Sequence, residues 1–124
     1  MVPTLEILKA LADRNRLRIV TALNRYDELC ACQITELLQV TGATASRHLS
    51  ILQHAGVLES RKEGRWVYYR LAPLDGTDAV FTWLEQSCGD TEPFQTDAQS
   101  LEKIVGIGRE VLCRMQRGEA CCPK

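Results

Sequence analysis

The stretch "QITELLQVTGATASRHLSILQHAG", residues 33–56, decides the fold because it holds two amphipathic segments joined by a short turn. Leucine and isoleucine recur in both segments at the spacing that gathers them on one face of a helix. In the turn, "TGAT", Gly42 can adopt a positive φ, and Gly56 is suited to end the second helix. Two helices joined in this way are typical of a helix-turn-helix.

The next seventeen residues, "VLESRKEGRWVYYRLAP" (57–73), predict a β-hairpin. Two runs rich in β-branched and aromatic residues flank "KEGR", where Gly64 supplies the backbone angle of a tight turn. Helix, turn, helix and basic hairpin together predict a winged helix-turn-helix, which is mainly α with a small β-hairpin.

Further helices are expected on both sides of this unit. Near the start, one segment places Leu5, Leu8 and Leu11 with Ile7 on one side, and the next repeats the pattern at residues 17–23 with three arginines exposed. After the hairpin we expect a helix over 77–88, a polar linker over 89–97 and a longer helix over 98–118 that glycines weaken at its centre. We therefore predict a DNA-binding and dimerisation domain over 1–90, and a C-terminal helix and cysteine-bearing tail over 91–124.

Composition narrows the class of protein. The chain has 124 residues and a net charge of −1, but residues 41–72 carry five basic side chains against two acidic ones. A local basic face on a near-neutral protein is compatible with a DNA contact surface. Arginines and Lys9 interrupt every apolar run near the start, and no run reaches the length of a membrane span, so we expect a soluble cytoplasmic protein with no membrane partner. Catalytic groupings of side chains are not recognisable, so the sequence does not predict an enzyme.

The outward face of the second helix is the expected DNA-reading surface. Ala45, Leu49 and Leu52 fix its inward face. The remaining polar side chains would then meet bases and phosphates of double-stranded operator DNA, and the basic residues of the hairpin would contact the backbone or minor groove. The predicted DNA-binding residues are Thr44, Ser46, Arg47, His48, Ser50, Arg61, Lys62 and Arg65. One such unit binds weakly, so we expect a two-fold homodimer paired through the helices at 5–12 and 77–88.

Six cysteines, at 30, 32, 88, 113, 121 and 122, are many for a chain of this size. In a reducing compartment they are expected as thiols, and their spacing is not that of a zinc finger. Cys88 and Cys113 fit the role of small buried hydrophobes. "CAC" at 30–32 and "ACCPK" at the end fit that role less well.

Three motifs carry a resemblance to a known family: "LCAC" before the first reading helix, "SRHLSILQHAGVL" across the second, and "RKEGRWVYYRL" in the hairpin. In these motifs, over roughly residues 4–90, the chain resembles the ArsR/SmtB metal-sensing repressors, and most of all the arsenical-resistance operon repressors. The resemblance implies a homodimeric repressor that sits on its operator when ligand-free. It would leave the DNA when As(III) or Sb(III) binds as inducer, with no organic cofactor.

In the arsenite-responsive branch, the resemblance implies a C-x-C-x2-C site, of which Cys30 and Cys32 match the first two positions. Thr35 stands at the third, and its hydroxyl does not replace a thiolate. A third sulfur could come from Cys121, Cys122 or Cys113, or these three could form a site of their own, or a small thiol or water could complete the site. Side chains at i and i+2 of a helix point about 200° apart. One ion would therefore need an unwound start to the helix at 33–40.

Two other functions on the same fold stay open. One is a thiol redox or persulfide switch, because oxidants attack the same thiolates. The other is a Cd or Zn sensor, which the small number of histidines disfavours because such sites usually use His and carboxylate or four thiolates.

Overall fold

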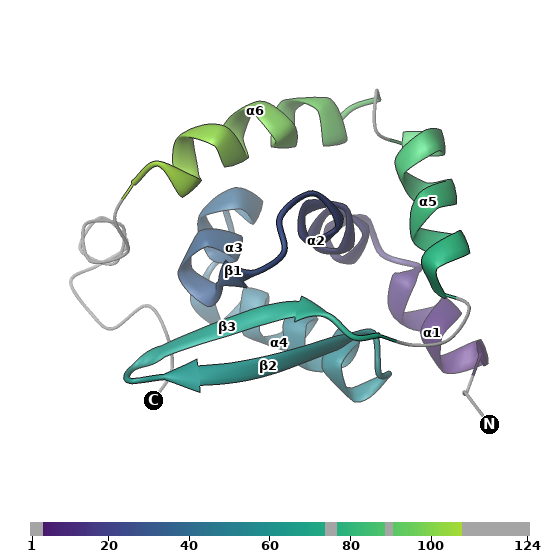
Figure 1. Ribbon diagram of the computed structural model, residues 1–124, viewed down its shortest axis with the longest axis horizontal. Coiled ribbons are helices and arrows are strands. Elements are labelled where there is room, and N and C mark those ends of the chain that lie inside the picture. The colour runs from purple at the N-terminus through teal and green to yellow at the C-terminus, as the bar shows by residue number, and fades with distance from the viewer. Residues whose placement is uncertain (1–3, 74–76, 89–90, 108–124) are drawn as a thin grey trace.

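The computed structural model describes residues 4–73, 77–88 and 91–107, which form six helices and three strands (Figure 1). Their bounds are α1 (Thr4–Leu11), α2 (Arg14–Arg25), β1 (Leu29–Cys30), α3 (Ala31–Leu38), α4 (Gly42–His54), β2 (Leu58–Glu63), β3 (Trp66–Leu71), α5 (Thr77–Cys88) and α6 (Phe94–Val105). The helix-turn-helix is α3 followed by α4, and the wing is the β2–β3 hairpin. The predicted fold class, mainly α with a small β-hairpin, is confirmed.

The turn between α3 and α4 differs from the expected one. Gln39 ends α3 with a left-handed backbone, φ 56°, and the positive φ expected at Gly42 is absent there. Thr41 caps α4 by accepting a hydrogen bond from the backbone N–H of Thr44 at 3.1 Å, so Gly42 already lies in the first helical turn. Gly56, with φ 88°, follows the end of α4 as predicted.

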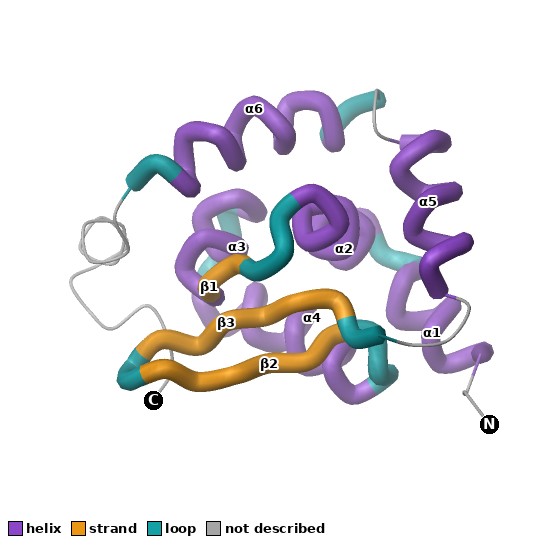
Figure 2. Tube along the Cα trace, viewed as in Figure 1, coloured by secondary structure: helices purple, strands orange, loops and turns teal. Residues whose placement is uncertain are grey.

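The sheet has three antiparallel strands in the order β1-β3-β2 (Figure 2). In the hairpin, Glu63 pairs with Trp66, and Gly64 in the turn between them has φ 64°, as its sequence predicts. The two-residue β1 was not expected, because residues 26–32 read as a break between helices. It joins the sheet by pairing Cys30 with Tyr68 on β3.

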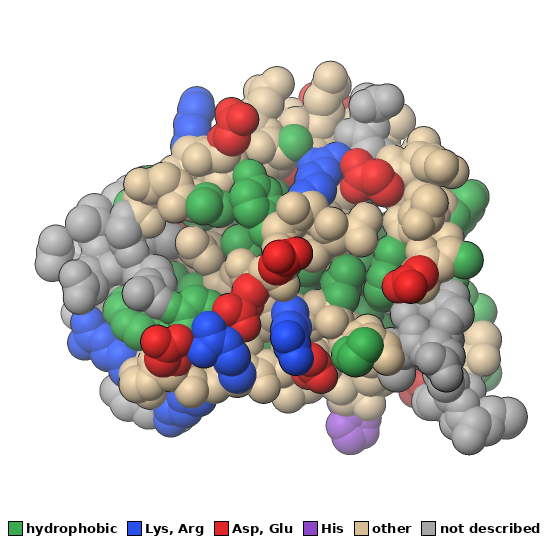
Figure 3. Space-filling model, viewed as in Figure 1, with side chains coloured by type: hydrophobic (Ala, Val, Ile, Leu, Met, Phe, Trp, Pro, Cys, Tyr) green, Lys and Arg blue, Asp and Glu red, His purple; other side chains and the backbone are tan. Residues whose placement is uncertain are grey.

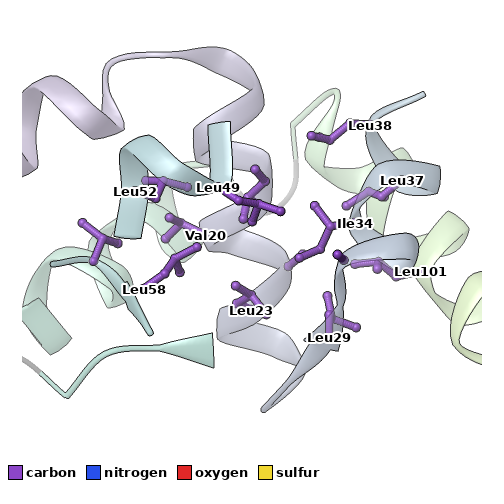
Figure 4. Packing of buried hydrophobic residues seen from close by; sticks show 14 of the residues in the cluster. Val20, Leu23, Leu29, Ile34, Leu37, Leu38, Leu49, Leu52, Leu58 and Leu101 are labelled. Carbon is purple, nitrogen blue, oxygen red and sulfur yellow. The ribbon is translucent and has the colours of Figure 1, made fainter. Parts of the chain in front are cut away.

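The core lies between α2, the helix-turn-helix and the sheet (Figure 4). The predicted inward face of α4 is confirmed, since Ala45, Leu49 and Leu52 are 1%, 2% and 0% exposed. For α1 the expected apolar face, with Leu5, Leu8 and Leu11 on one side, was wrong. Leu5 and Leu8 are 62% and 54% exposed, because Ile7, Ala10 and Leu11 form the buried stripe of this short helix instead.

The last described helix, α6, starts four residues before the expected position because Phe94 and Asp97 are buried rather than part of a polar linker. It crosses over α2 and α3 (Figure 1) and buries Leu101 in the same core. Arg18 of α2 binds Asp97 through two hydrogen bonds of 2.8 and 2.9 Å and donates a third to the carbonyl of Leu37, at 3.0 Å. Arg18, expected to be exposed, thus fastens α6 to the end of α3, while the rest of the predicted helix, 108–118, lies outside the described residues.

Within the part of the chain that the structure describes, no helix combines the length and apolarity needed to cross a bilayer.

Candidate functional site

Cys30 and Cys32 face one another at the start of α3. Cys30 is the N-cap, with an extended backbone (φ −76°, ψ 151°), and Cys32 lies in the first turn. Their sulfur atoms are 3.2 Å apart, and both residues are 0% exposed. The expected divergence of about 200° applies to two helical residues. Because only Cys32 is helical here, the two thiols meet without any unwinding of α3, which begins at Ala31 rather than at 33.

The local sequence holds this arrangement in two ways. The side-chain oxygen of Gln33 accepts a hydrogen bond from the backbone N–H of Cys30 at 2.8 Å, in the manner of a capping box. On its other side Cys30 belongs to β1 and pairs with Tyr68. The pair is therefore buried, fixed in position and suited to bind a soft ion.

Within the described part of the chain, no third His, Cys, Asp or Glu joins this pair to make a metal-binding group. The hydroxyl of Thr35 donates to the carbonyl of Ala31 at 2.8 Å, within its own helix. Among the described residues no group of three His, Cys, Asp or Glu side chains could hold a metal ion, and Cys88 is half-buried on α5. The other candidate ligands, Cys113, Cys121 and Cys122, lie outside the described residues.

The outer face of α4 carries most of the predicted reading residues. Ser46, Arg47 and Ser50 are exposed, whereas Thr44 is partly buried and its hydroxyl bonds that of Thr41 at 3.0 Å. Gln53, also exposed, donates to the hydroxyl of Ser60 on β2 at 3.1 Å. This bond joins the reading helix to the wing.

His48 does not lie on that face, contrary to our expectation. It is 5% exposed, and its Nδ1 lies 3.2 Å from the Arg16 guanidinium and 3.9 Å from the Asp13 carboxylate at the start of α2. Burial lowers the pKa of His48, helped by the nearby positive charges of Arg16 and Arg47 and opposed by Asp13. Burial alone would raise the pKa of Asp13, but backbone N–H donors and the same Arg16 bring it below its usual value. His48 therefore ties α4 to α2.

The three wing residues predicted to bind DNA differ in their surroundings. Arg61 donates to both carboxylate oxygens of Glu28, at 2.7 and 2.8 Å, and to Glu63 at 2.8 Å. Its guanidinium also lies 4.6 Å from the centre of the Tyr68 ring. Lys62 is exposed, and Arg65 lies 5.0 Å from the ring centre of Trp66. The part played by Glu28 was missed, because 33 residues separate it from Arg61 and no local pattern connects them.

These features, a buried helix-turn-helix core, an exposed polar reading face and a basic hairpin, define a winged helix-turn-helix transcriptional regulator. The model of the family described as "Bacterial regulatory protein, arsR family" matches residues 13–60. The chain belongs to this family.

Three relatives show how similar the chain is to individual proteins. It is 45% identical over 67 residues to the arsenic resistance transcriptional regulator ArsR1 of Pseudomonas putida, covering 54% of this chain and 52% of that one. It is 44% identical over 69 residues to the arsenical resistance operon repressor of Escherichia coli, covering 56% and 59%. To the cadmium resistance regulatory protein CadC of Listeria innocua it is 49% identical over 61 residues, covering 49% and 51%. The chain spans about half the length of these relatives.

Solved structures agree with the fold. HlyU from Vibrio cholerae superposes with a TM-score of 0.64 at 28% identity, covering 68% of this chain and 90% of that one.

Proposed function

We propose that the chain is a metalloid-responsive repressor that binds operator DNA as a homodimer and releases it when Cys30 and Cys32 bind As(III) or Sb(III). The observation that carries this proposal is the pair of buried sulfur atoms 3.2 Å apart at the first turn of the helix-turn-helix. The names of the arsenic-resistance relatives support the same effector.

The chemistry of the pair favours a trivalent metalloid. Arsenous acid, As(OH)3, condenses with each thiol: an As–S bond forms, an As–O bond breaks, and the hydroxide leaves with the thiol proton as water. Two thiols leave one hydroxyl on arsenic, which a third thiol from Cys113, Cys121 or Cys122 would replace. Soft sulfur ligands select such ions. The product carries no net charge, which suits a site where both residues are 0% exposed.

DNA contact is assigned to the outer face of α4 and to the tip of the wing. Arg47 is placed to read a guanine, with Ser46, Ser50 and Thr44 contributing contacts to bases or phosphates. Lys62 and Arg65 are placed to contact the backbone. Leu5, Leu8 and Trp83, which are 54% to 62% exposed on α1 and α5, offer apolar surface for pairing two subunits.

Release would follow from the packing of α3 against α4. A metalloid bonded to the first turn of α3 changes the position of that helix, and α4 depends on it for its own position. Coupling between two sites of this kind is typically about 1–3 kcal/mol.

Cadmium is the second candidate effector, because the chain is also 49% identical over 61 residues to a cadmium resistance regulator. A Cd²⁺ site of four thiolates would bear a net negative charge, which a fully buried site opposes. A redox or persulfide response of the same thiols is the remaining alternative.

One experiment separates these effectors. An operator duplex, selected from a random pool by repeated binding and amplification, is titrated with the reduced protein, alone and with arsenite, Cd²⁺ or hydrogen peroxide. We expect release by arsenite under full reduction. Release by Cd²⁺ or peroxide alone would assign the site to the alternatives, and failure to select any duplex would contradict the repressor function itself. Sedimentation at micromolar concentration should give about twice the 13.9 kDa of one chain.

The third ligand has its own test. The double variant Cys121→Ser/Cys122→Ser should weaken arsenite release tenfold or more, a loss of about 1.4 kcal/mol, if the tail completes the site. Cys113→Ser is the matched single change. An unchanged response in both would leave water or a small thiol as the third ligand.

A further inference from the structure

We propose that Glu28 transmits the state of the Cys30–Cys32 pair to the wing by holding Arg61, so that the wing is a second output of the thiol site beside α4. This inference rests on the proposed function and adds a route that does not pass through the helix-turn-helix contact. It makes Glu28 and Arg61 positioning residues for DNA binding rather than DNA ligands.

The contacts next to the thiol pair connect Cys30, Tyr68, Arg61 and Glu28 in a closed ring. Glu28 immediately precedes β1, in which Cys30 pairs with Tyr68 on β3. The Tyr68 ring lies under the Arg61 guanidinium, and Tyr68 and Arg61 are themselves partners in the β2–β3 register. Arg61 returns to Glu28 through two hydrogen bonds. A displacement of Cys30 therefore reaches the hairpin by two contacts. One is the backbone pairing of Cys30 with Tyr68, and the other is the side-chain pair of Glu28 with Arg61.

Within this ring of contacts, β1 is the part that is able to move. It has two residues and one neighbouring strand, whereas β2 and β3 pair over six residues. Cys30 and Cys32 sit in a core that excludes solvent, and closely packed cores accommodate a new atom only by shifting their walls. An arsenic atom bonded to both sulfurs thus displaces the short strand and, with it, Glu28.

Charge pairing explains why a displacement of Glu28 changes the position of Arg61. Three bonds to two carboxylates fix the guanidinium on the sheet, where acidic and basic side chains gather (Figure 3). The hydrogen bond from Arg61 lowers the pKa of the Glu28 carboxyl, helped by the charge of Arg70, so Glu28 stays ionised at neutral pH. In the same cleft lies a second pair, Arg70 with Glu59, which joins β3 to β2 and, among the described residues, makes no hydrogen bond to Glu28. The chain thus contains its own control.

The first test is the release factor, defined as the dissociation constant for the selected operator duplex with arsenite divided by that without. We expect Glu28→Gln and Arg61→Met each to reduce this factor at least fivefold, and the double variant to reduce it no further than the stronger single one. Glu59→Gln should leave it unchanged. If Arg61 were a DNA contact instead, Arg61→Met would weaken binding equally in both states, and Glu28→Gln would tighten it. Those results would overturn the proposal.

The second test needs no DNA and judges the inference separately from the repressor function. Phenylarsine oxide bridges two thiols, forming two As–S bonds and releasing one water. With this reagent bound, amide hydrogen exchange in residues 58–71 should rise in the wild type, and the rise should be at least halved in Glu28→Gln. Unchanged exchange in the wild-type wing would overturn the inference. A normal wing response in a protein that arsenite does not release from DNA would contradict the proposed function alone.

Discussion

The two helices of the helix-turn-helix begin in similar ways but in opposite environments. At α3 the side chain of Gln33 caps the backbone of Cys30, and the two sulfur atoms at this helix start, on the N-cap and in the first turn, are fully buried. At α4 the hydroxyl of Thr41 caps the backbone of Thr44, and Thr41, Ser46 and Arg47 around this helix start are exposed. Both helix starts present positive dipole ends. Burial with soft donors suits a small uncharged species, whereas exposure with hydroxyls and Arg47 suits DNA.

The difference also shows what each helix start can tolerate. A buried start is a closed volume, so any bound atom must displace its neighbours. An exposed start can lose one contact and keep its shape. Changes at α3 should therefore act mainly on the response to the effector, and changes at α4 on DNA affinity in both states.

The largest effect is expected at α3. Cys30→Ser and Cys32→Ser should each abolish release by arsenite, because serine keeps the size of cysteine but loses the soft donor. Operator affinity without arsenite should stay near the wild-type value, measured by fluorescence anisotropy. Matched Ala variants separate loss of sulfur from the cost of burying a hydroxyl, which is about 1–3 kcal/mol of folding stability when the hydroxyl has no partner. Normal release by both Ser variants would show that the start of α3 is not the arsenite-binding site.

A smaller effect, on operator affinity rather than on release by arsenite, is expected at the start of α4. Arg47→Ala should cost about 1–3 kcal/mol of operator affinity and relax specificity at one base position. The release factor should not change, since Arg47 lies outside the thiol site. Arg65→Ala, at the wing, is the comparison: it should weaken all sequences more evenly and flatten the salt dependence. Wild-type affinity in Arg47→Ala would mean that another helix enters the groove.

The α4 cap should contribute to stability. Thr41→Ala removes the acceptor for the Thr44 N–H and should lower the free energy of unfolding by about 1 kcal/mol, measured by urea denaturation. Thr41→Ser keeps the hydroxyl and should recover most of this loss. An equal loss in both variants would show that the methyl group, not the cap, carries the effect.

The smallest expected effect concerns pH. Burial depresses the pKa of His48 below its ordinary value of 6.5, so the unfolded chain takes up a proton first as the pH falls. The contribution of His48 to stability is therefore fully present above pH 6.5 and is lost below it, through the window between the ordinary and the depressed pKa. Burial sets the lower edge of this window; the charge of Asp13 raises it and the charges of Arg16 and Arg47 lower it further. His48→Gln should flatten the decline in thermal unfolding, whereas His54→Gln, an exposed imidazole on the same helix, should not.

Local patterns were sufficient for the hairpin and the inward face of α4. Each depends on residues a few positions apart, such as Gly64 in its turn or Leu49 and Leu52 on one stripe. What the sequence could not predict depends on partners far along the chain. Arg61 meets Glu28 across 33 residues, His48 meets Arg16 across 32, and Arg18 meets Asp97 across 79. Periodicity describes faces of a single element and carries no information about which faces meet.

The clamp formed by Arg18 bears on how this regulator can be divided. Its guanidinium binds the Asp97 carboxylate of α6 and also donates to the carbonyl of Leu37 in the last turn of α3. The carboxylate that neutralises Arg18 therefore lies outside the family-matched residues 13–60. A buried charge left without its partner typically costs about 3–5 kcal/mol. The family-matched unit is therefore not a self-contained module: a chimaera that fuses residues 1–90 to a foreign tail would leave Arg18 without its carboxylate beside α3 and would need to supply one of its own.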